Sequence, residues 1–361
     1  MNKKTLLSGV MLPLLLALST SSSAQLMQAK EIYTKADSLR GELTPLRTCY
    51  DIQYYHLDVS VDIAKKFISG SNLFKFKAVD DFKRLQFDLF DNLSVDRVEY
   101  HGKPLKFSRA YNAVFVDFPA VIPKATIDSF TVYYSGHPIQ ATRAPWDGGF
   151  DWKKDSNGKP FVATACQGLG ASVWWPNKDH QSDEVDSMLI SVAVPQDLIN
   201  VSNGRLIKIE QLKNGYKKFH WKVSNPINNY NIALNIGDYI NWNEVYKGEK
   251  GNLDLSYYIL SEHNTKENRA HLSKNVTETL EAFEHWFGPY PFYEDSYKIV
   301  ETAHLGMEHQ SAIAYGNKFK NGYLGRDGSN TGWGNRWDFI VVHESGHEWF
   351  GNNITAKDLA D

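Results

Sequence analysis

The sequence predicts two folded units, an antiparallel all-β domain followed by a unit of mixed α+β class. From Tyr50 to about Trp242, apolar and polar residues mostly alternate with a period of two, which is typical of strands. After Leu260 the apolar residues recur at spacings of three and four, which indicates helices. A chain of 361 residues with 42% hydrophobic and 13% aromatic residues is long and apolar enough for two or more domains with sizeable cores.

The first residues are typical of a secretory signal peptide, which we expect to cover residues 1–24. Two lysines precede an apolar run from Leu6 to Leu18, and small residues follow as far as Ala24. A membrane anchor is the alternative, but this run is shorter than the about 20 apolar residues that span a bilayer. No later stretch is long and apolar enough to cross. We therefore expect an exported protein, periplasmic or extracellular, without a stable membrane span.

We assign residues 25–245 to the β domain. Strands are expected in five β-rich segments, at residues 54–62, 74–78, 130–134, 189–194 and 219–223. Two Asn-Gly pairs, at 203–204 and 214–215, are typical of hairpin turns because both residue types tolerate positive φ.

Residues 246–361 form the second predicted unit. An amphipathic helix is expected where Leu272, Val276, Leu280, Phe283 and Phe287 form one apolar stripe that Gly288-Pro289 ends. Strands are expected at 297–300 and 312–315. A last helix is predicted over about 336–350, with Asn335 as its N-cap, Asp338 three residues on where a capping box carries Glu, and Gly351 at its end.

The last predicted helix contains the motif H-E-x-x-H. Helical residues four apart lie about 40° apart around the axis, so His343 and His347 project from one face and can bind one zinc ion as neutral imidazoles. Glu344 directly follows a ligand and cannot easily reach the same ion, which favours a role as general base toward water. Hydrolytic zinc requires a third protein ligand, which this motif does not supply. Two structural histidines on a core helix are the alternative interpretation.

Composition excludes several other functions. With 39 basic and 42 acidic residues the formal net charge is −3, which gives no indication of nucleic acid or an anionic membrane as a partner.

Cys49 and Cys166 are the only cysteines of the sequence. They could pair in an oxidising compartment, but two isolated cysteines make a poor metal site. Nothing in the pattern predicts an oligomeric state.

A second segment makes the functional interpretation of H-E-x-x-H more specific. Gly306-Met307-Glu308 precedes H-E-x-x-H-x-W-F-G-N by some thirty-odd residues, an arrangement that resembles the aminopeptidase N family of gluzincin zinc metallopeptidases. Three further segments resemble that family in the same order along the chain: its opening strand at 50–58, its Gln-containing stretch at 166–179, and the strand that closes its β domain at 232–239.

The resemblance implies a fold and an activity. It implies that the second unit is the first part of an α+β thermolysin-like catalytic domain, and that the protein is a zinc-dependent aminopeptidase. His343 and His347 match the ligands of one zinc ion, and Glu344 matches the general base. The expected partners are peptides with a free N-terminus.

The resemblance also implies how a peptide is bound. Glu308 matches the carboxylate that binds the substrate's free α-amino group, and Gln167 matches the residue that assists it. The backbone near Leu305, Gly306 and Met307 is expected to line the substrate in the manner of a strand. An ammonium fits against a carboxylate where a continuing chain has no room, which would explain removal of one residue at a time.

Three departures from the family pattern bear on these expectations. The family usually has Gly-x-Met-Glu-Asn, whereas this chain has Leu305 at the first of these positions and His309 at the last. The family's third zinc ligand, a Glu, is expected just past Asp361, and its Tyr that stabilises the reaction intermediate lies further on. The chain therefore resembles an N-terminal part of the enzyme, and on its own we expect it to bind zinc weakly and to have little activity.

Two alternatives to the aminopeptidase stay open at this point. One is a non-catalytic peptide-binding module in which the zinc helix is vestigial. The other is an endopeptidase, which H-E-x-x-H alone allows. A Glu-bearing helix at the expected downstream position would support an enzyme, and the dependence of activity on Glu308 would separate an aminopeptidase from an endopeptidase.

Overall fold

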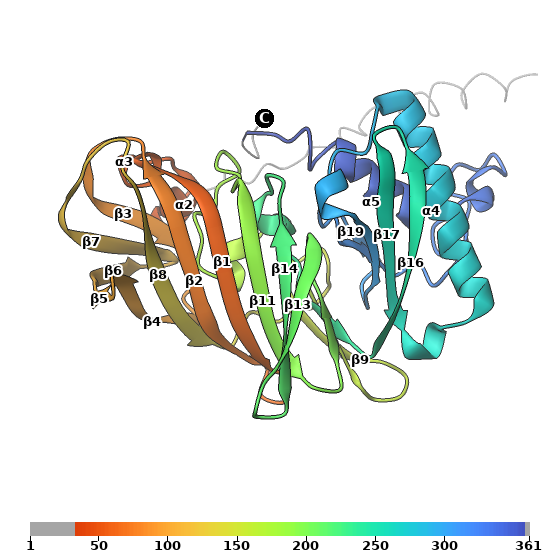
Figure 1. Cartoon of the computed structure of the whole chain (residues 1–361), viewed down its shortest axis with the longest axis horizontal. Coiled ribbons are helices and arrows are strands. Elements are labelled where there is room, and N and C mark those ends of the chain that lie inside the picture. The colour runs from red at the N-terminus through yellow and green to blue at the C-terminus, as the bar shows by residue number, and fades with distance from the viewer. Residues whose placement is uncertain (1–32, 358–361) are drawn as a thin grey trace, which may run out of the picture.

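The computed structural model describes residues 33–357. Figure 1 shows a β-rich first part, followed by a smaller sheet that packs with the helices α4 and α5. This arrangement confirms the predicted fold class, a β domain followed by an α+β unit. The predicted signal peptide at 1–24 lies outside the described residues.

The largest sheet contains all five predicted strands. Its order is β13-β14-β11-β1-β2-β8-β4-β5, and every neighbouring pair is antiparallel except β1 with β11, which is parallel. One parallel pair therefore departs from the predicted antiparallel domain. The strands are β1 (Tyr50–Asp62), β2 (Phe67–Ala78), β4 (Leu93–Tyr100), β5 (Lys103–Pro104), β8 (Ile127–Gly136), β11 (Ser187–Pro195), β13 (Arg205–Gln211) and β14 (Tyr216–Val223).

Two smaller sheets complete the first part of the chain. Most of their strands share one hydrophobic core with the large sheet, and Trp174 and Trp175 are among its largest fully buried side chains. The three-stranded sheet has the order β3-β7-β6 and the four-stranded sheet β12-β15-β10-β9. Their bounds are β3 (Phe82–Asp88), β6 (Lys106–Ala110), β7 (Ala113–Ile122), β9 (Gly149–Lys154), β10 (Pro160–Ala165), β12 (Ile199–Val201) and β15 (Asn235–Gly237).

The two Asn-Gly pairs have different roles. Asn214-Gly215 joins the antiparallel strands β13 and β14, which confirms the predicted hairpin. The hairpin predicted at Asn203-Gly204 is wrong, because β12 and β13 belong to different sheets. The pair makes the crossing between them and contacts the second unit, since Asn203 Nδ2 donates to the Gln310 carbonyl (2.7 Å) and Gly204 N donates to Ser311 Oγ (2.9 Å). A positive φ at Gly204 therefore serves a crossover as well as it would a hairpin.

Two short helices, α2 (Lys35–Gly41) and α3 (Pro45–Thr48), precede the first strand. α2 begins with a capping box in which Thr34 and Asp37 bond reciprocally. α3 contributes the fully buried Arg47, whose guanidinium is paired with the buried carboxylate of Asp88.

The second unit is a five-stranded sheet with the order β16-β17-β18-β20-β19. Its strands are β16 (Tyr239–Gly248), β17 (Gly251–Leu260), β18 (Tyr297–Glu301), β19 (Gly306–Met307) and β20 (Ile313–Tyr315), so both predicted strands are present. The helices α4 (Lys266–Phe287) and α5 (Phe339–Trp349) share a hydrophobic cluster with this sheet. Because Tyr258 and Val300 instead join the first core, apolar contacts cross between the units, and the limit at residue 245 stays a prediction.

The helix α4 follows its predicted stripe. Leu272, Val276 and Leu280 are buried, whereas Phe287 at its end is 52% exposed. Among the described residues, no helix combines the length and the apolar character that crossing a bilayer needs. Cys49 and Cys166 are both buried free thiols.

The N-cap of α5 is Asp338, and the predicted start at Asn335 is wrong. Both residue types are good caps, but burial separates them. Asn335 is exposed, whereas the fully buried carboxylate of Asp338 accepts bonds from Ile340 N (3.0 Å) and Val341 N (3.3 Å). The same carboxylate also accepts bonds from three side chains, those of His271 (2.8 Å), Tyr315 (2.7 Å) and Asn317 (2.7 Å).

We predict that Asp338→Ala lowers the free energy of unfolding by about 3–5 kcal/mol, because it removes a helix cap and leaves buried donors without their acceptor. Chemical denaturation monitored by tryptophan fluorescence measures the loss. Asn335→Ala is the matched control and should change stability by less than about 0.5 kcal/mol. Equal losses in the two variants would contradict the assignment of the cap.

Candidate metal and peptide site

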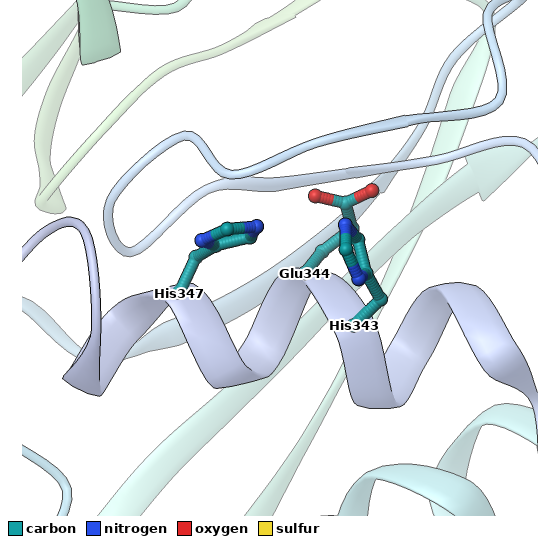
Figure 2. A group of neighbouring side chains, drawn as sticks. All are labelled: His343, Glu344 and His347. Carbon is teal, nitrogen blue, oxygen red and sulfur yellow. The ribbon is translucent and has the colours of Figure 1, made fainter. Parts of the chain in front are cut away.

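The two histidines of the motif lie on one face of α5. Figure 2 shows His343 and His347 projecting to the same side of the helix, with the Glu344 carboxylate beside them. The imidazole centroids are 4.9 Å apart, and one ligand atom from each of the three residues lies within 4.8 Å of the others. His347 Nδ1 lies 3.0 Å from the carbonyl oxygen of Phe350, which leaves Nε2 for a metal.

Electrostatics favours neutral imidazole at His343. Burial, and then the neighbouring His347, lowers the pKa of His343, so its metal-binding neutral form is favoured. The ring of His343 also stacks on Phe339, with centroids 5.4 Å apart, which restrains its orientation. This pair of nitrogens suits a divalent transition metal such as zinc.

Glu344 is a buried carboxyl group beside these imidazoles. It is 6% exposed, and burial followed by the charge of Glu308 raises its pKa to about 8. The strand β19 passes very close to it at Gly306. A Cβ atom at Gly306 would collide with Glu344 Oε1 and with Ile340, so a larger residue there would require these side chains to move.

Glu308 directly follows β19 and is 4% exposed. Its Oε1 accepts a hydrogen bond from Gln167 Nε2 (2.7 Å) and a longer one from the Tyr230 hydroxyl (3.3 Å). The structure therefore brings together two residues that the sequence analysis selected, Glu308 and Gln167, although 141 positions separate them.

Tyr230 was missed by sequence reasoning. It lies just before the segment 232–239 and carries no local pattern that distinguishes it from a core aromatic residue. Its hydroxyl meets Glu308 across 78 positions of the chain. Only the fold brings this contact about, so the sequence offered no signal for it.

Gly306 and Met307 lie in β19, the last strand of its sheet. Gly306 pairs with Tyr315 and Met307 with Ala314. The Met307 side chain is 2% exposed, so it is the backbone of this strand that a peptide could meet.

The last turn of α5 and the residues that follow it are tied to the segment that carries Glu308. Asn352 Nδ2 donates to the Glu308 carbonyl (2.8 Å), and Asn352 Oδ1 accepts from Asn231 Nδ2 of the β domain (2.8 Å). The buried Glu348 accepts from Ser311 N (2.8 Å), a few residues beyond Glu308. These contacts fix Glu308 relative to the histidine helix.

Two further histidines lie buried near Glu308. His304 is 4% and His309 is 0% exposed, and no ring nitrogen of either has a hydrogen-bond partner among the described residues. Burial lowers the pKa of His304 to about 4, and burial together with His304 lowers the pKa of His309 to about 3. Both imidazoles are therefore neutral at ordinary pH.

Comparison with known proteins gives two findings. Residues 52–230 match the family model of the peptidase M1 N-terminal domain. The fold is similar to that of an M1 zinc metallopeptidase from Deinococcus radiodurans, solved as a mutant bound to a Tyr-Ser-Ala substrate, with 18% identity and a TM-score of 0.69 over 86% of this chain and 67% of that one.

Two related structures match this chain with nearly the same identity, coverage and TM-score. A two-domain M1 zinc metallopeptidase mutant bound to L-arginine matches with 18% identity and a TM-score of 0.68, over 86% of this chain and 67% of that chain. The M1 zinc metallopeptidase from Deinococcus radiodurans matches with 19% identity and a TM-score of 0.69, over 86% of this chain and 66% of that chain. At this identity the likeness establishes a shared fold.

We predict that His309 makes the protein sensitive to acid. Its pKa in the folded chain, about 3, is below the ordinary value of 6.5, so the folded state binds fewer protons than the unfolded state. Stability is therefore full above pH 6.5 and is lost as the pH falls toward 3. Between pH 6.5 and pH 5, protonation of His309 should lower the free energy of unfolding of the parent by about 2 kcal/mol, and His309→Asn should abolish this part of the decrease.

The free energy of unfolding is measured by urea denaturation at several pH values. The variant and the parent are compared by the slope of this free energy against pH, because effects of the substitution that do not depend on pH leave the slope unchanged. The exposed His285 provides the control, since His285→Asn should leave the slope unchanged. An unchanged slope in His309→Asn would contradict the prediction.

Proposed function

Because this chain belongs to the M1 peptidase family by its N-terminal domain over residues 52–230, we propose that it forms part of a zinc-dependent aminopeptidase, which removes N-terminal residues from peptides. One observation carries the proposal. The buried Glu308 is held beside the histidine helix, because Asn352 donates to its carbonyl oxygen (2.8 Å) and the preceding Gly306 lies against Glu344, so a possible anchor for a cation and a pair of metal-type ligands lie in one region.

The residues present fit one zinc ion. His343 and His347 would hold it through neutral imidazole nitrogens, and the contact of His347 Nδ1 with Phe350 orients that ring. We propose that a third protein ligand comes from beyond the described residues. When bound, zinc supplies Lewis acidity, which polarises a substrate carbonyl and makes water a better nucleophile near neutral pH.

Glu344 would accept the proton of the attacking water and later donate it. Its carboxylate lies beside the two ligand rings, where it can accept a proton from the attacking water at one oxygen. A cation bound at the histidines would favour the carboxylate form of Glu344 that accepts the proton, and the carboxyl group can then return this proton to the nitrogen of the leaving amine. Its burial also keeps bulk water from competing for the proton.

Glu308 would anchor the substrate. An α-ammonium group donates charge-assisted hydrogen bonds, and the Glu308 carboxylate, oriented by Gln167 and Tyr230, can accept them. The backbone of β19, as the last strand of its sheet, can pair with the extended peptide behind that ammonium. Together these groups place the first peptide bond near the histidines and favour cleavage at the N-terminus.

We also propose that the enzyme acts outside the cytoplasm. The basic start, the apolar run and the small residues before Ala24 support export through a cleaved signal peptide.

Glu344→Gln tests the catalytic proposal in the protein expressed from its complete reading frame. We expect kcat on leucine anilide to fall about 10²- to 10⁴-fold, because the proton acceptor is lost, while zinc content measured by mass spectrometry stays at one ion per chain. The exposed Glu281 offers the matched control, and Glu281→Gln should retain full activity. Full activity in Glu344→Gln would refute the base role, and full zinc content in a His343→Ala, His347→Ala double variant would refute the metal site.

Glu308→Gln tests the anchoring proposal. Loss of a charge-assisted contact should raise KM for peptides with a free N-terminus about 10- to 100-fold. Peptides with an acetylated N-terminus should remain poor substrates of both proteins. If the variant cleaves internal bonds of blocked peptides as well as the parent does, the protein is an endopeptidase and the assignment of Glu308 is wrong.

A further inference from the structure

A groove of about 490 Å³ lies between the β domain and the sheet of the second unit. One wall comes from the crossover and the start of β13, at Gly204, Arg205 and Leu206, together with Trp221 of β14. The floor comes from β16, β17 and β18. Among the described residues that line this groove, none belongs to the proposed zinc site or to the proposed amine anchor.

The floor of the groove is the face of the second sheet opposite to its helices. Side chains alternate between the two faces of a strand. Tyr246, Leu253 and Leu255 share a hydrophobic cluster with residues of α4. The alternate positions line the groove as three cross-strand pairs, which are Asn241 with Tyr258, Asn243 with Ser256, and Val245 with Asp254. The groove is therefore the part of this face that the β domain does not fill.

Lys298 contributes a buried cation to the floor. It pairs with Ser256 in the neighbouring strand and is 1% exposed. Its ammonium donates to the Gly204 carbonyl and lies 5.7 Å from the centre of the Trp221 ring. Within residues 33–357 it forms no ion pair, and burial lowers its pKa to about 7. Since a buried cation without a paired anion is unfavourable, an anion in the groove would stabilise this ammonium.

The other charged groups of the lining already have partners. Arg205 donates to Asp254 (2.5 Å) and also to two backbone carbonyls of the segment before β18. Glu244 accepts from the hydroxyl of Ser273 in α4 (2.5 Å), on the helix side of the sheet. Lys298 is therefore the charged group of the lining that is available to a ligand.

The outer part of the groove is partly apolar. Leu206 is 38% and Val245 is 58% exposed, although both side chains are apolar. Between them and the lysine lie neutral polar groups, such as the Ser256 hydroxyl, which donates to Asn243 Oδ1 (2.8 Å). A short hydrocarbon chain would remove part of the exposed apolar surface from water.

We propose that this groove binds a small organic carboxylate that carries a short apolar chain. The carboxylate pairs with the ammonium of Lys298, and the chain contacts Leu206 and Val245. The volume of the groove is within the range of small-molecule sites. This inference goes beyond the proposed peptidase function and does not depend on it.

Isothermal titration calorimetry of the protein from its complete reading frame tests the site. The probes are hexanoate and hexanamide, which have the same chain and differ in charge. We expect hexanoate to bind about tenfold more tightly, because its bond to Lys298 is charge-assisted. Equal affinities for the two probes, or no binding of hexanoate, would overturn the proposal.

Two variants show whether the hexanoate lies in this groove. Lys298→Met keeps the length of the side chain and removes its charge, so it should lower the affinity for hexanoate about tenfold and leave that for hexanamide unchanged. Lys266→Met, at an exposed lysine of α4, is the matched control and should change neither affinity.

Val245→Asp provides a second variant at an exposed position, where the fold tolerates a polar side chain. Repulsion between two anions should lower the affinity for hexanoate about three- to tenfold. The uncharged Val245→Asn should instead affect hexanoate and hexanamide alike. Hexanoate bound at the proposed zinc would respond to neither Lys298→Met nor Val245→Asp, and that result would also overturn the proposal.

Discussion

The site depends on the hydrogen bond from Asn352 to the carbonyl oxygen of Glu308. Asn352 lies shortly after the end of the histidine helix at Trp349, and its other amide atom accepts a bond from Asn231 of the β domain. One side chain thus connects three segments that are far apart in the sequence. Because Glu348 also accepts a bond from Ser311 N, the backbone around Glu308 has little freedom to move relative to the histidine helix. Cleavage at one defined peptide bond requires a fixed distance between the group that would hold the substrate's amine and the residues that would bind the metal.

The sequence could predict the features that depend on neighbouring residues. The alternation in β1 and the apolar stripe of α4 are local patterns, and H-E-x-x-H is local as well, because a single helix positions both imidazoles. Features that depend on distant contacts could not be predicted in this way. Spacing alone does not pair Gln167 with Glu308, and that pairing was expected only from the resemblance to a family. Tyr230 had no local signal, and burial, which the sequence does not display, decided between Asn335 and Asp338 as the cap of α5.

The absence of a side chain at one glycine brings the strand β19 close to the carboxylate that we propose as the base. β19 approaches Glu344 so closely at Gly306 that a methyl group there would displace the carboxylate. The strand proposed to pair with the substrate therefore lies next to the residue proposed to handle its proton, and the missing Cβ atom at Gly306 allows this approach.

Buried acids in this region also show which ligands the site favours. Glu308 and Glu344 are each at least 94% buried, and burial, followed by the charge of Glu308, raises the pKa of Glu344 to about 8. No lysine or arginine forms an ion pair with either of them among the described residues. Burial without a paired cation favours the neutral form of a carboxyl group, whereas a nearby cation favours the carboxylate. A divalent metal at the histidines and an ammonium at Glu308 would favour the carboxylate forms that the proposed base and the proposed anchor require. The absence of a paired cation therefore supports the proposal that the metal and the free N-terminus are ligands of one site.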